Sequence, residues 1–384
     1  MSAAASLLAE LIRCPSVTPD AMAALDVVEA YLTPLGFVCT RLRFDGRNSY
    51  PVDNLFATRG TGGRHLLFAG HVDVVPPGDE TDWSHPPFGA EIDNGIMFGR
   101  GAVDMKSGIA CFCAALAEAV AEGGTEGGTI SLAITGDEEA DSINGTDRIM
   151  EWAEAKGHRF DFAIVGEPSS AQRVVDRLKT GRRGSLNGRI ALVGRQGHSA
   201  YPDDAINPLP VLTRIAAALT DTPLDEGTKD FQPSKLVLTS IDTGNKASNV
   251  IPGKAELKFN IRFSDLWSDE SLRGWLHERI ASIDLGGCEM SFDEPVHGAI
   301  PFVCPPGEAV ALLDKLIAAE TGAAPEHSTT GGTSDARYIA KYCPVVECGL
   351  VGASMHQTDE RVPLADLAVL TRLYRRFISA YLGG

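Results

Sequence analysis

The chain has 384 residues, of which 44% are hydrophobic and 22% are charged, and its formal net charge is −17 at pH 7. A chain of this length exceeds the roughly 250–300 residues at which a single core stops growing, so we expect two domains. The acidic balance argues against nucleic acid and against a membrane surface as partners, because both attract clustered Lys and Arg. No apolar run reaches the ~18 residues of a membrane span.

The hydrophobic pattern predicts a series of alternating elements. The first 13 residues lack the basic segment of a signal peptide and predict a helix. Further helices are predicted near residues 20–34, 106–122, 145–156, 206–219, 268–283, 307–321 and 363–382. Strands are predicted near 65–70, 129–135, 160–165, 189–193, 235–241 and 254–263. This alternation is typical of an α/β fold.

The pattern changes between residues 183 and 297, where alternating strands surround two helices. We therefore expect an inserted, smaller α+β domain at 183–297, and a discontinuous catalytic domain formed by 1–182 and 298–384. Glycine-containing segments at 181–184 and 295–298 are the expected hinges. Eight cysteines are scattered without zinc-ribbon spacing, which predicts reduced thiols and a cytoplasmic protein.

Acidic residues follow one apolar run directly. Asp137, Glu138 and Glu139 come after residues 129–136, and adjacent carboxylates at a strand end are costly unless positive charge meets them. A bound metal would supply that charge. The other ligand-type side chains that follow apolar runs are His71, Asp73, Glu167 and His356.

This mixture of imidazole and carboxylate suits zinc, and a carboxylate can bridge two metal ions about 3.5–4 Å apart. Asp104 precedes a predicted helix and is the expected bridge. Asp73 lies two residues after His71, so on an extended chain it points the same way and can hold the second ring nitrogen. Of Glu138 and Glu139, one can bind metal while the other accepts a proton from water, and spacing alone permits either assignment.

Six blocks in this order resemble the superfamily of zinc amidohydrolases and exopeptidases that contains acetylornithine deacetylases, aminoacylases, carboxypeptidase G-type enzymes and succinyl-diaminopimelate desuccinylases. The blocks are residues 70–76, 99–108, 135–139, 165–169 and 197–202, and His356. The resemblance covers nearly the whole chain. It implies a two-domain, zinc-exopeptidase-like α/β fold whose inserted domain pairs two subunits into a homodimer.

Four further blocks, at 181–186, 248–252, 260–262 and 329–337, resemble the desuccinylase branch. That branch implies hydrolysis of N-succinyl-L,L-2,6-diaminopimelate, a small dicarboxylic N-acyl amino acid, to succinate and L,L-2,6-diaminopimelate in lysine biosynthesis. Two positions depart from the branch pattern. Ser248 stands where many relatives have a second asparagine, and Ala336 stands where glycine is common, and both concern the fit of the substrate.

The resemblance also implies a role for each matching residue. It makes Glu138 the general base, Asp73 an orienting residue, and His198 a donor to the carbonyl oxygen that a dimer would supply across subunits. The implied metal ligands, which would hold two Zn²⁺ per subunit with Co²⁺ as a substitute, are His71, Asp104, Glu139, Glu167 and His356. The implied substrate contacts are Arg182, Ser185, Asn249, Arg262, Gly332 and Thr333.

Other interpretations remain open at this point. A deacetylase or dipeptidase on the same scaffold would differ only in acyl selectivity, for which Arg182 and Arg262 favour a dicarboxylic group. A zinc-dependent binding protein without activity is a third alternative, although metal binding alone would not require Glu138 beside a ligand. Residues 331–334 also suit an ordinary loop that ends in a helix N-cap at Ser334 or Asp335.

Overall fold

The computed structural model describes residues 1–293 and 298–383, and the chain forms two compact units. Unit 1 consists of Met1–Thr180, Cys304–Ser328 and Ser334–Gly384. Unit 2 consists of Gly181–Val303 and Thr329–Thr333. Unit 2 begins two residues before and ends six residues after the inserted domain expected at 183–297, and it also takes Thr329–Thr333, the first part of the 329–337 block. Of the expected second hinge, residues 295–297 lie outside the described part of the chain.

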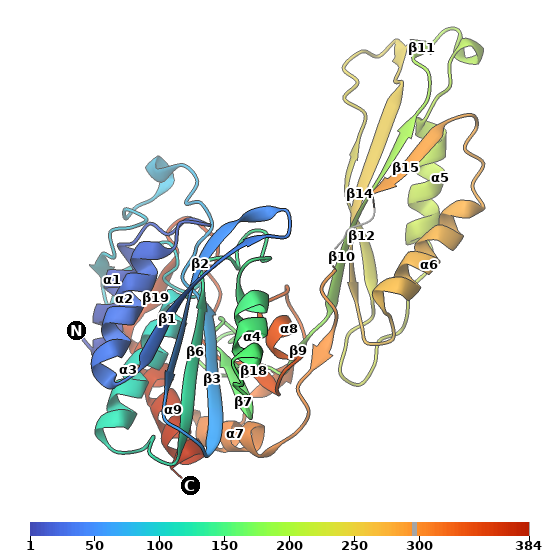
Figure 1. The fold of residues 1–384 in the computed structure, drawn as a ribbon. Helices are drawn as coiled ribbons and strands as arrows, with labels where there is room; N and C mark the ends of the chain where they lie inside the picture. The colour runs from blue at the N-terminus through green and yellow to red at the C-terminus, as the bar shows by residue number, and fades with distance from the viewer. Residues whose placement is uncertain (294–297, 384) are drawn as a thin grey trace. The chain divides into compact units, whose positions relative to one another are not determined.

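A mixed eight-stranded sheet forms the centre of unit 1 (Figure 1). Its strands, in spatial order, are β1 (Val38–Gly46), β2 (Ser49–Arg59), β6 (Gly128–Thr135), β3 (Arg64–His71), β7 (Phe162–Val165), β18 (Val345–Glu347), β8 (Arg177–Lys179) and β17 (Glu326–Ser328). The four strands β6, β3, β7 and β18 run parallel. Because parallel strands end at the same edge of a sheet, the residues that follow them are brought together.

Helices cover both faces of this sheet, which confirms the α/β class. One hydrophobic core contains side chains of α1 (Ala3–Ile12), α2 (Met22–Leu32), α3 (Lys106–Ala121), α7 (Glu308–Thr321) and α9 (Leu364–Leu382). On the opposite face lie α4 (Thr146–Ala155) and the short α8 (Ala336–Ile339). A small three-stranded sheet is formed by β4 (Ile92–Asp93), β5 (Ile96–Phe98) and β19 (Arg361–Pro363).

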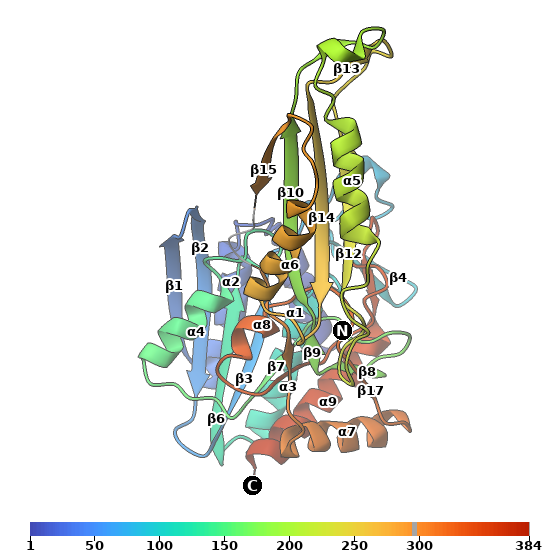
Figure 2. The ribbon, with the colours of Figure 1, turned by 90° about the vertical axis from the view of Figure 1, so that its right-hand side faces the viewer.

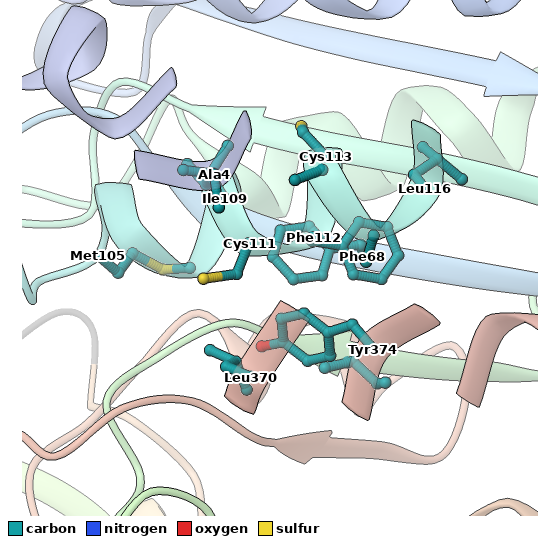
Figure 3. Packing of buried hydrophobic residues seen from close by; sticks show 14 of the residues in the cluster. Ala4, Phe68, Met105, Ile109, Cys111, Phe112, Cys113, Leu116, Leu370 and Tyr374 are labelled. Atoms are coloured by element: carbon teal, nitrogen blue, oxygen red, sulfur yellow. The ribbon is translucent and has the colours of Figure 1, made fainter. Parts of the chain in front are cut away.

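Helix α3 is buried along most of its length because it packs against β3 of the sheet and against both α1 and α9. The rings of Phe68 on β3 and Phe112 on α3 are stacked, with centroids 4.0 Å apart (Figure 3). Tyr374 of α9 meets Phe112 edge-on at 5.4 Å, and its hydroxyl donates to the carbonyl oxygen of Cys348. Burying each such ring stabilises the fold by about 1.5–3 kcal/mol. The loop that enters α3 at Asp104 is therefore attached to a rigid element.

Unit 2 is built on a four-stranded antiparallel sheet in the order β12 (Lys235–Asp242), β14 (Lys254–Phe263), β10 (Gly184–Val193) and β15 (Glu289–Asp293). Helices α5 (Leu209–Thr220) and α6 (Asp269–Ala281) cover one face of it (Figure 2), where Leu212 and Leu276 belong to the same core as Phe259. Two-residue pairs complete the unit: β9 (Gly181–Arg182) with β16 (Phe302–Val303), and β11 (Gly197–His198) with β13 (Val250–Ile251). Within the described residues of both units, every helix is too short or too polar to cross a lipid bilayer.

Candidate metal centre

The ends of three parallel strands supply most of the expected ligands. His71 is the last residue of β3, Glu138 and Glu139 follow the end of β6, and Glu167 follows the end of β7. The remaining two come from loops, with Asp104 just before α3 and His356 between β18 and β19. All of these residues belong to unit 1. The open α/β sheet thus places them where such sheets bind ligands.

Asp104 lies between two histidines. Its Oδ1 atom is 3.3 Å from His71 Nε2, and its Oδ2 atom is 3.3 Å from His356 Nε2. On the far sides, Glu167 Oε1 is 3.5 Å from His71 Nε2 and Glu139 Oε2 is 3.2 Å from His356 Nε2. The side chains therefore form two groups that share Asp104, as a bridging ligand requires.

The donor atoms are close enough to hold metal. One atom each from His71, Glu138 and Glu167 lies within 4.8 Å of the others, and the same holds for His71, Asp104 and Glu139. His71 donates from Nδ1 to the backbone oxygen of Asp73 at 3.0 Å, so in the neutral ring the Nε2 lone pair is directed towards Asp104. Imidazole and carboxylate donors in this combination suit zinc.

The charges of the cluster also fit a bound cation. Burial, followed by the charges of neighbouring carboxylates, raises the pKa of Glu138 and the pKa of Glu167 well above their usual values. Hydrogen bonds with Asp104 and Glu139 raise the pKa of His356 to about 10. Both effects arise because carboxylates are crowded in a buried place, and positive charge from protons or from metal relieves the repulsion.

The Asp73 carboxylate contacts the backbone of Glu138 and Glu139 more closely than it contacts the His71 ring. Its carboxylate accepts the backbone N–H of Glu138 and of Glu139, each at 3.1 Å, and the hydroxyl of Thr18 at 2.7 Å. The distance from its Oδ1 to His71 Nδ1 is 3.6 Å, which is longer than a hydrogen bond. The expected contact between the Asp73 carboxylate and the ring is thus replaced by the backbone oxygen of Asp73.

Asp137, the first residue of the acidic triplet, closes the loop that follows the two glutamates. Its buried carboxylate accepts the hydroxyl of Tyr50 at 2.6 Å and the backbone N–H groups of Ser142, Ile143 and Asn144 at 3.1, 3.0 and 3.2 Å. No role was predicted for Asp137 from the sequence. Its position in the triplet was the only available signal, because its partners come from 87 residues upstream and from the loop itself.

A second buried carboxylate lies behind this loop. Asp335 accepts the hydroxyl of Thr146 at 2.6 Å and that of Ser142 at 3.3 Å, and burial raises its pKa to about 6. Ser334 donates to Glu347. Asp335 occupies the N-cap position of the four-residue helix α8, which is one of the two expected positions, although its side chain makes no capping hydrogen bond. Its charge adds to the field that disfavours ionisation of Glu138.

The six expected substrate contacts all belong to unit 2, and all except Asn249 fall into two local networks. Arg182 donates from Nη1 to the backbone oxygens of Thr330 and Gly332, each at 3.2 Å, which places it beside Gly332 and Thr333. In the other network, Asn260 donates to Ser185 Oγ at 3.1 Å and accepts from Arg262 Nε at 3.0 Å. Ser185 and Arg262 are also register partners in β10 and β14.

His198 and Asn249 lie side by side at the exposed β11–β13 pair. The backbone N–H of Ser199 donates to the oxygen of Asn249 at 3.0 Å. The Nδ1 atom of His198 accepts the backbone N–H of Ala200 at 3.0 Å, so the neutral ring carries its proton on Nε2. His198 is exposed and therefore presents Nε2–H as a donor to solvent or to a ligand.

Comparison with known proteins agrees with this arrangement. Residues 67–380 match the model of peptidase family M20/M25/M40. A succinyl-diaminopimelate desuccinylase of Bradyrhizobium sp. strain BTAi1 is 49% identical over 382 residues, which cover 99% of this chain and 100% of the relative. A succinyl-diaminopimelate desuccinylase of Rhodopseudomonas palustris strain HaA2 is 49% identical over 387 residues, with the same coverage.

Solved structures show the same fold at low identity. The M20 family metallo-carboxypeptidase Sso-CP2 of Sulfolobus solfataricus has a TM-score of 0.82 at 18% identity, and the match covers 100% of both chains. Human carnosine dipeptidase 1 has a TM-score of 0.77 at 17% identity, with 99% of this chain and 96% of that chain covered. The match of the family model over most of the chain and the 49% identity of full-length relatives lead to one conclusion. The chain is a member of peptidase family M20/M25/M40.

Proposed function

We propose that this protein hydrolyses N-succinyl-L,L-2,6-diaminopimelate to succinate and L,L-2,6-diaminopimelate, a step of lysine and diaminopimelate biosynthesis. The position of Asp104 between His71 and His356, beside Glu138, supports metal-assisted hydrolysis. The two full-length relatives that carry the desuccinylase name support this substrate. The eight cysteines are free thiols, which supports a cytoplasmic location.

We further propose two Zn²⁺ ions per subunit, with Co²⁺ as a substitute. The residues that would hold them are His71 and Glu167 on one side, Glu139 and His356 on the other, and Asp104 between. When bound, two such ions polarise the amide carbonyl and make the attacking water more acidic. This assignment leaves Glu138 without a ligand role, although its carboxylate lies in the same cluster.

In this proposal Glu138 moves the proton. Its carboxylate takes a proton from water as the water oxygen bonds to the succinyl carbonyl carbon. The same proton passes to the amide nitrogen as the carbon–nitrogen bond breaks, so that diaminopimelate leaves as an amine. The second proton of the water stays on the new carboxyl group of succinate and passes to the released amine at neutral pH, which gives a carboxylate and an ammonium group. The hydrogen bond from the Glu138 N–H to Asp73 holds the base in position for both transfers.

His198 would donate from Nε2 to the carbonyl oxygen as negative charge develops there. Loss of one such donor elsewhere costs about 3–4 kcal/mol in the transition state. We propose that a homodimer supplies this histidine from the second subunit. Mixing His198→Ala chains with Glu138→Ala chains tests the proposal, because a mixed dimer then contains one complete site. Activity that does not recover on mixing would contradict it.

Substrate binding is proposed for Arg182, Ser185, Asn249, Arg262, Gly332 and Thr333. A substrate with several carboxylates must approach a chain with a net charge of −17, so it needs local cations. The guanidinium groups of Arg182 and Arg262 supply such charges in unit 2. The same acidity supports the absence of nucleic-acid and membrane partners.

The substrate assignment is tested by comparing turnover of N-succinyl-L,L-2,6-diaminopimelate, N-acetylornithine and a dipeptide at equal concentrations. We expect kcat/KM to favour the succinyl substrate by at least about tenfold, since each lost charged contact costs about 1.5–3 kcal/mol. Preference for N-acetylornithine or the dipeptide would retain the hydrolytic chemistry and contradict the substrate. Metal binding without turnover of any of the three would instead indicate a binding protein.

A further inference from the structure

One buried carboxylate outside the proposed ligand set contacts the loop that carries Asp104. Glu360 has a relative exposure of 0%. Its Oε1 atom accepts the backbone N–H groups of Val103 and Asp104 at 2.9 and 3.1 Å. Its Oε2 atom accepts the backbone N–H of Gly101 at 3.0 Å and Arg100 Nη1 at 2.9 Å. Both carboxylate oxygens of Glu360 therefore accept hydrogen bonds from residues 100–104.

Glu360 also belongs to the loop that carries His356, four residues earlier in the chain. The two loops are joined a second time through Arg100, which donates from Nη1 to the backbone oxygen of Gln357 at 3.2 Å. A third link is the backbone N–H of Gly99, which donates to the backbone oxygen of Glu360 at 2.8 Å. The loops of Asp104 and His356 are thus held together by one buried ion pair and its neighbours.

The loop needs an acceptor of this kind. The N–H groups of Gly101, Val103 and Asp104 are turned towards Glu360, and unpaired buried N–H groups are costly. Gly101 adopts φ +82°, and a Cβ atom added there would lie 2.7 Å from Val74 Cγ1. The loop therefore has little room to move to other acceptors, and a carboxylate is the only side chain that presents two acceptor oxygens to several donors without adding one.

We propose that Glu360 is a positioning residue that sets the carboxylate of Asp104 relative to His356, and that binding of one of the two metal ions depends on it. This inference rests on the metal centre of the proposed function. His71 and Glu167 are held at strand ends, whereas Asp104 and His356 both lie in loops attached to Glu360. Loss of Glu360 therefore affects the His356 side more strongly than the His71 side.

Replacement of Glu360 by Gln makes the expected disturbance specific. An amide has one acceptor oxygen and one NH₂ group. Each oxygen of Glu360 accepts two hydrogen bonds, so in either orientation the NH₂ group of Gln would face two donors that have lost their acceptor. Turning the NH₂ group towards Arg100 would leave the buried guanidinium facing a donor with no acceptor in place of Oε2, which is the more costly arrangement because Arg100 is charged. The NH₂ group is then expected to face the backbone N–H groups of Val103 and Asp104. The repulsion between these donors would move Asp104, the ligand that the two metal ions are proposed to share.

The experiment is a titration of Co²⁺ into metal-stripped full-length protein, followed by calorimetry and by the visible absorption of bound Co²⁺. We expect the wild type to bind two Co²⁺ per chain. In Glu360→Gln the first Co²⁺ should bind within about threefold of wild type and the second at least about tenfold more weakly, since partners that support ligands typically contribute 10–100-fold in affinity. The change in visible absorption on binding of the second Co²⁺ should also be smaller in Glu360→Gln than in the wild type.

Asp176→Asn is the matched control. Asp176 lies at the end of the loop between β7 and β8, nine residues after the proposed ligand Glu167. It accepts the backbone N–H groups of Ala171, Gln172 and Arg173, so these bonds stay within residues 171–176 and do not join two loops of the metal centre. This variant should bind two Co²⁺ with wild-type affinities whatever its thermal stability. If Glu360→Gln does not fold, Arg100→Lys replaces it, because a lysine keeps the charge beside Glu360 and loses the planar set of donors. It should show the same selective weakening.

Three results would overturn the inference. These are wild-type affinity for both Co²⁺ ions in Glu360→Gln, or in Arg100→Lys where that variant replaces it; equal weakening of both ions; or the same weakening in Asp176→Asn. A wild-type protein that binds no Co²⁺ would instead contradict the proposed function itself.

Discussion

His71 Nδ1 lies 3.0 Å from the backbone oxygen of Asp73 but 3.6 Å from the nearest carboxylate oxygen of the same residue. The backbone therefore orients the ring, and the Asp73 carboxylate is used for the N–H groups of Glu138 and Glu139. A change of the Asp73 side chain should consequently affect the proposed base Glu138 and its turn more than the proposed metal ligand His71.

Asp73→Asn should reduce kcat by about 10–100-fold while the protein keeps its metal content. All three hydrogen bonds end on Oδ2, where a neutral amide oxygen accepts more weakly than a carboxylate oxygen, and the amide NH₂ would face the Glu138 N–H, which lies 3.3 Å from Oδ1. Metal analysis and initial rates on the same sample measure both quantities. Thr18→Val, which removes one of the three bonds, is the control and should have a smaller effect. Loss of metal in proportion to activity would show that the carboxylate acts on His71 instead.

Removal of metal should lower the melting temperature. Without cations, the crowded carboxylates near Asp104 are relieved only by protons, and a ligand that binds the folded state at 100 times its Kd stabilises it by about 2.7 kcal/mol. Thermal unfolding with a chelator and with added Zn²⁺ measures the difference. His71→Ala should lose most of this response. An identical response in that variant would indicate metal bound elsewhere.

Tyr50→Phe should destabilise the protein by about 1–3 kcal/mol, because it leaves the buried carboxylate of Asp137 without its hydroxyl donor. Urea unfolding measures this change. Because the Asp137 loop follows Glu139 directly, a several-fold decrease in kcat should accompany it. Tyr201→Phe, at a ring that is 66% exposed, should change neither quantity and serves as the control. Equal effects of the two substitutions would contradict the role of Asp137.

Stability should fall as the pH rises above 9. Burial raises the pKa of the Cys111 and Cys113 thiols from 9.0 to about 12, so the unfolded chain loses these protons before the folded protein does. The stabilisation is complete below pH 9 and is lost as the pH rises towards 12, by about 1 kcal/mol per thiol at pH 10. Urea unfolding at pH 8 and pH 10 measures the fall, and Cys113→Ala should make it smaller. A fall of the same size in Cys113→Ala would contradict the assignment.

Long elements with a clear period were predicted well from the sequence. The helices expected at 106–122 and 363–382 are found at Lys106–Ala121 and Leu364–Leu382. The hairpin of β1 and β2 was missed, because its turn uses Arg47 and Asn48 at positive φ and not a glycine pair. The three-residue strands β8 and β17 pair residues about 150 positions apart, which no local pattern reveals.

The candidate site was predictable where ligand-type side chains follow an apolar run or, as for Asp104, precede a predicted helix. His71, Glu138, Glu139 and Glu167 could be found because each follows an apolar run. Glu360 could not, because it acts through backbone N–H groups 256 to 259 residues away, and backbone groups have no sequence signal. The true partner of the Asp73 carboxylate was missed for the same reason.

In the proposed function, a two-metal site with Glu138 as base hydrolyses the succinyl amide. The most direct test adds Zn²⁺ stepwise to metal-stripped protein while bound metal and succinate release are measured, for the wild type and for Glu138→Gln. We predict that release rises with metal and saturates at two ions per chain, and that Glu138→Gln binds the same metal but turns over about 10²–10⁴-fold more slowly. Full activity in the stripped protein, or an unchanged rate in Glu138→Gln, would contradict the account.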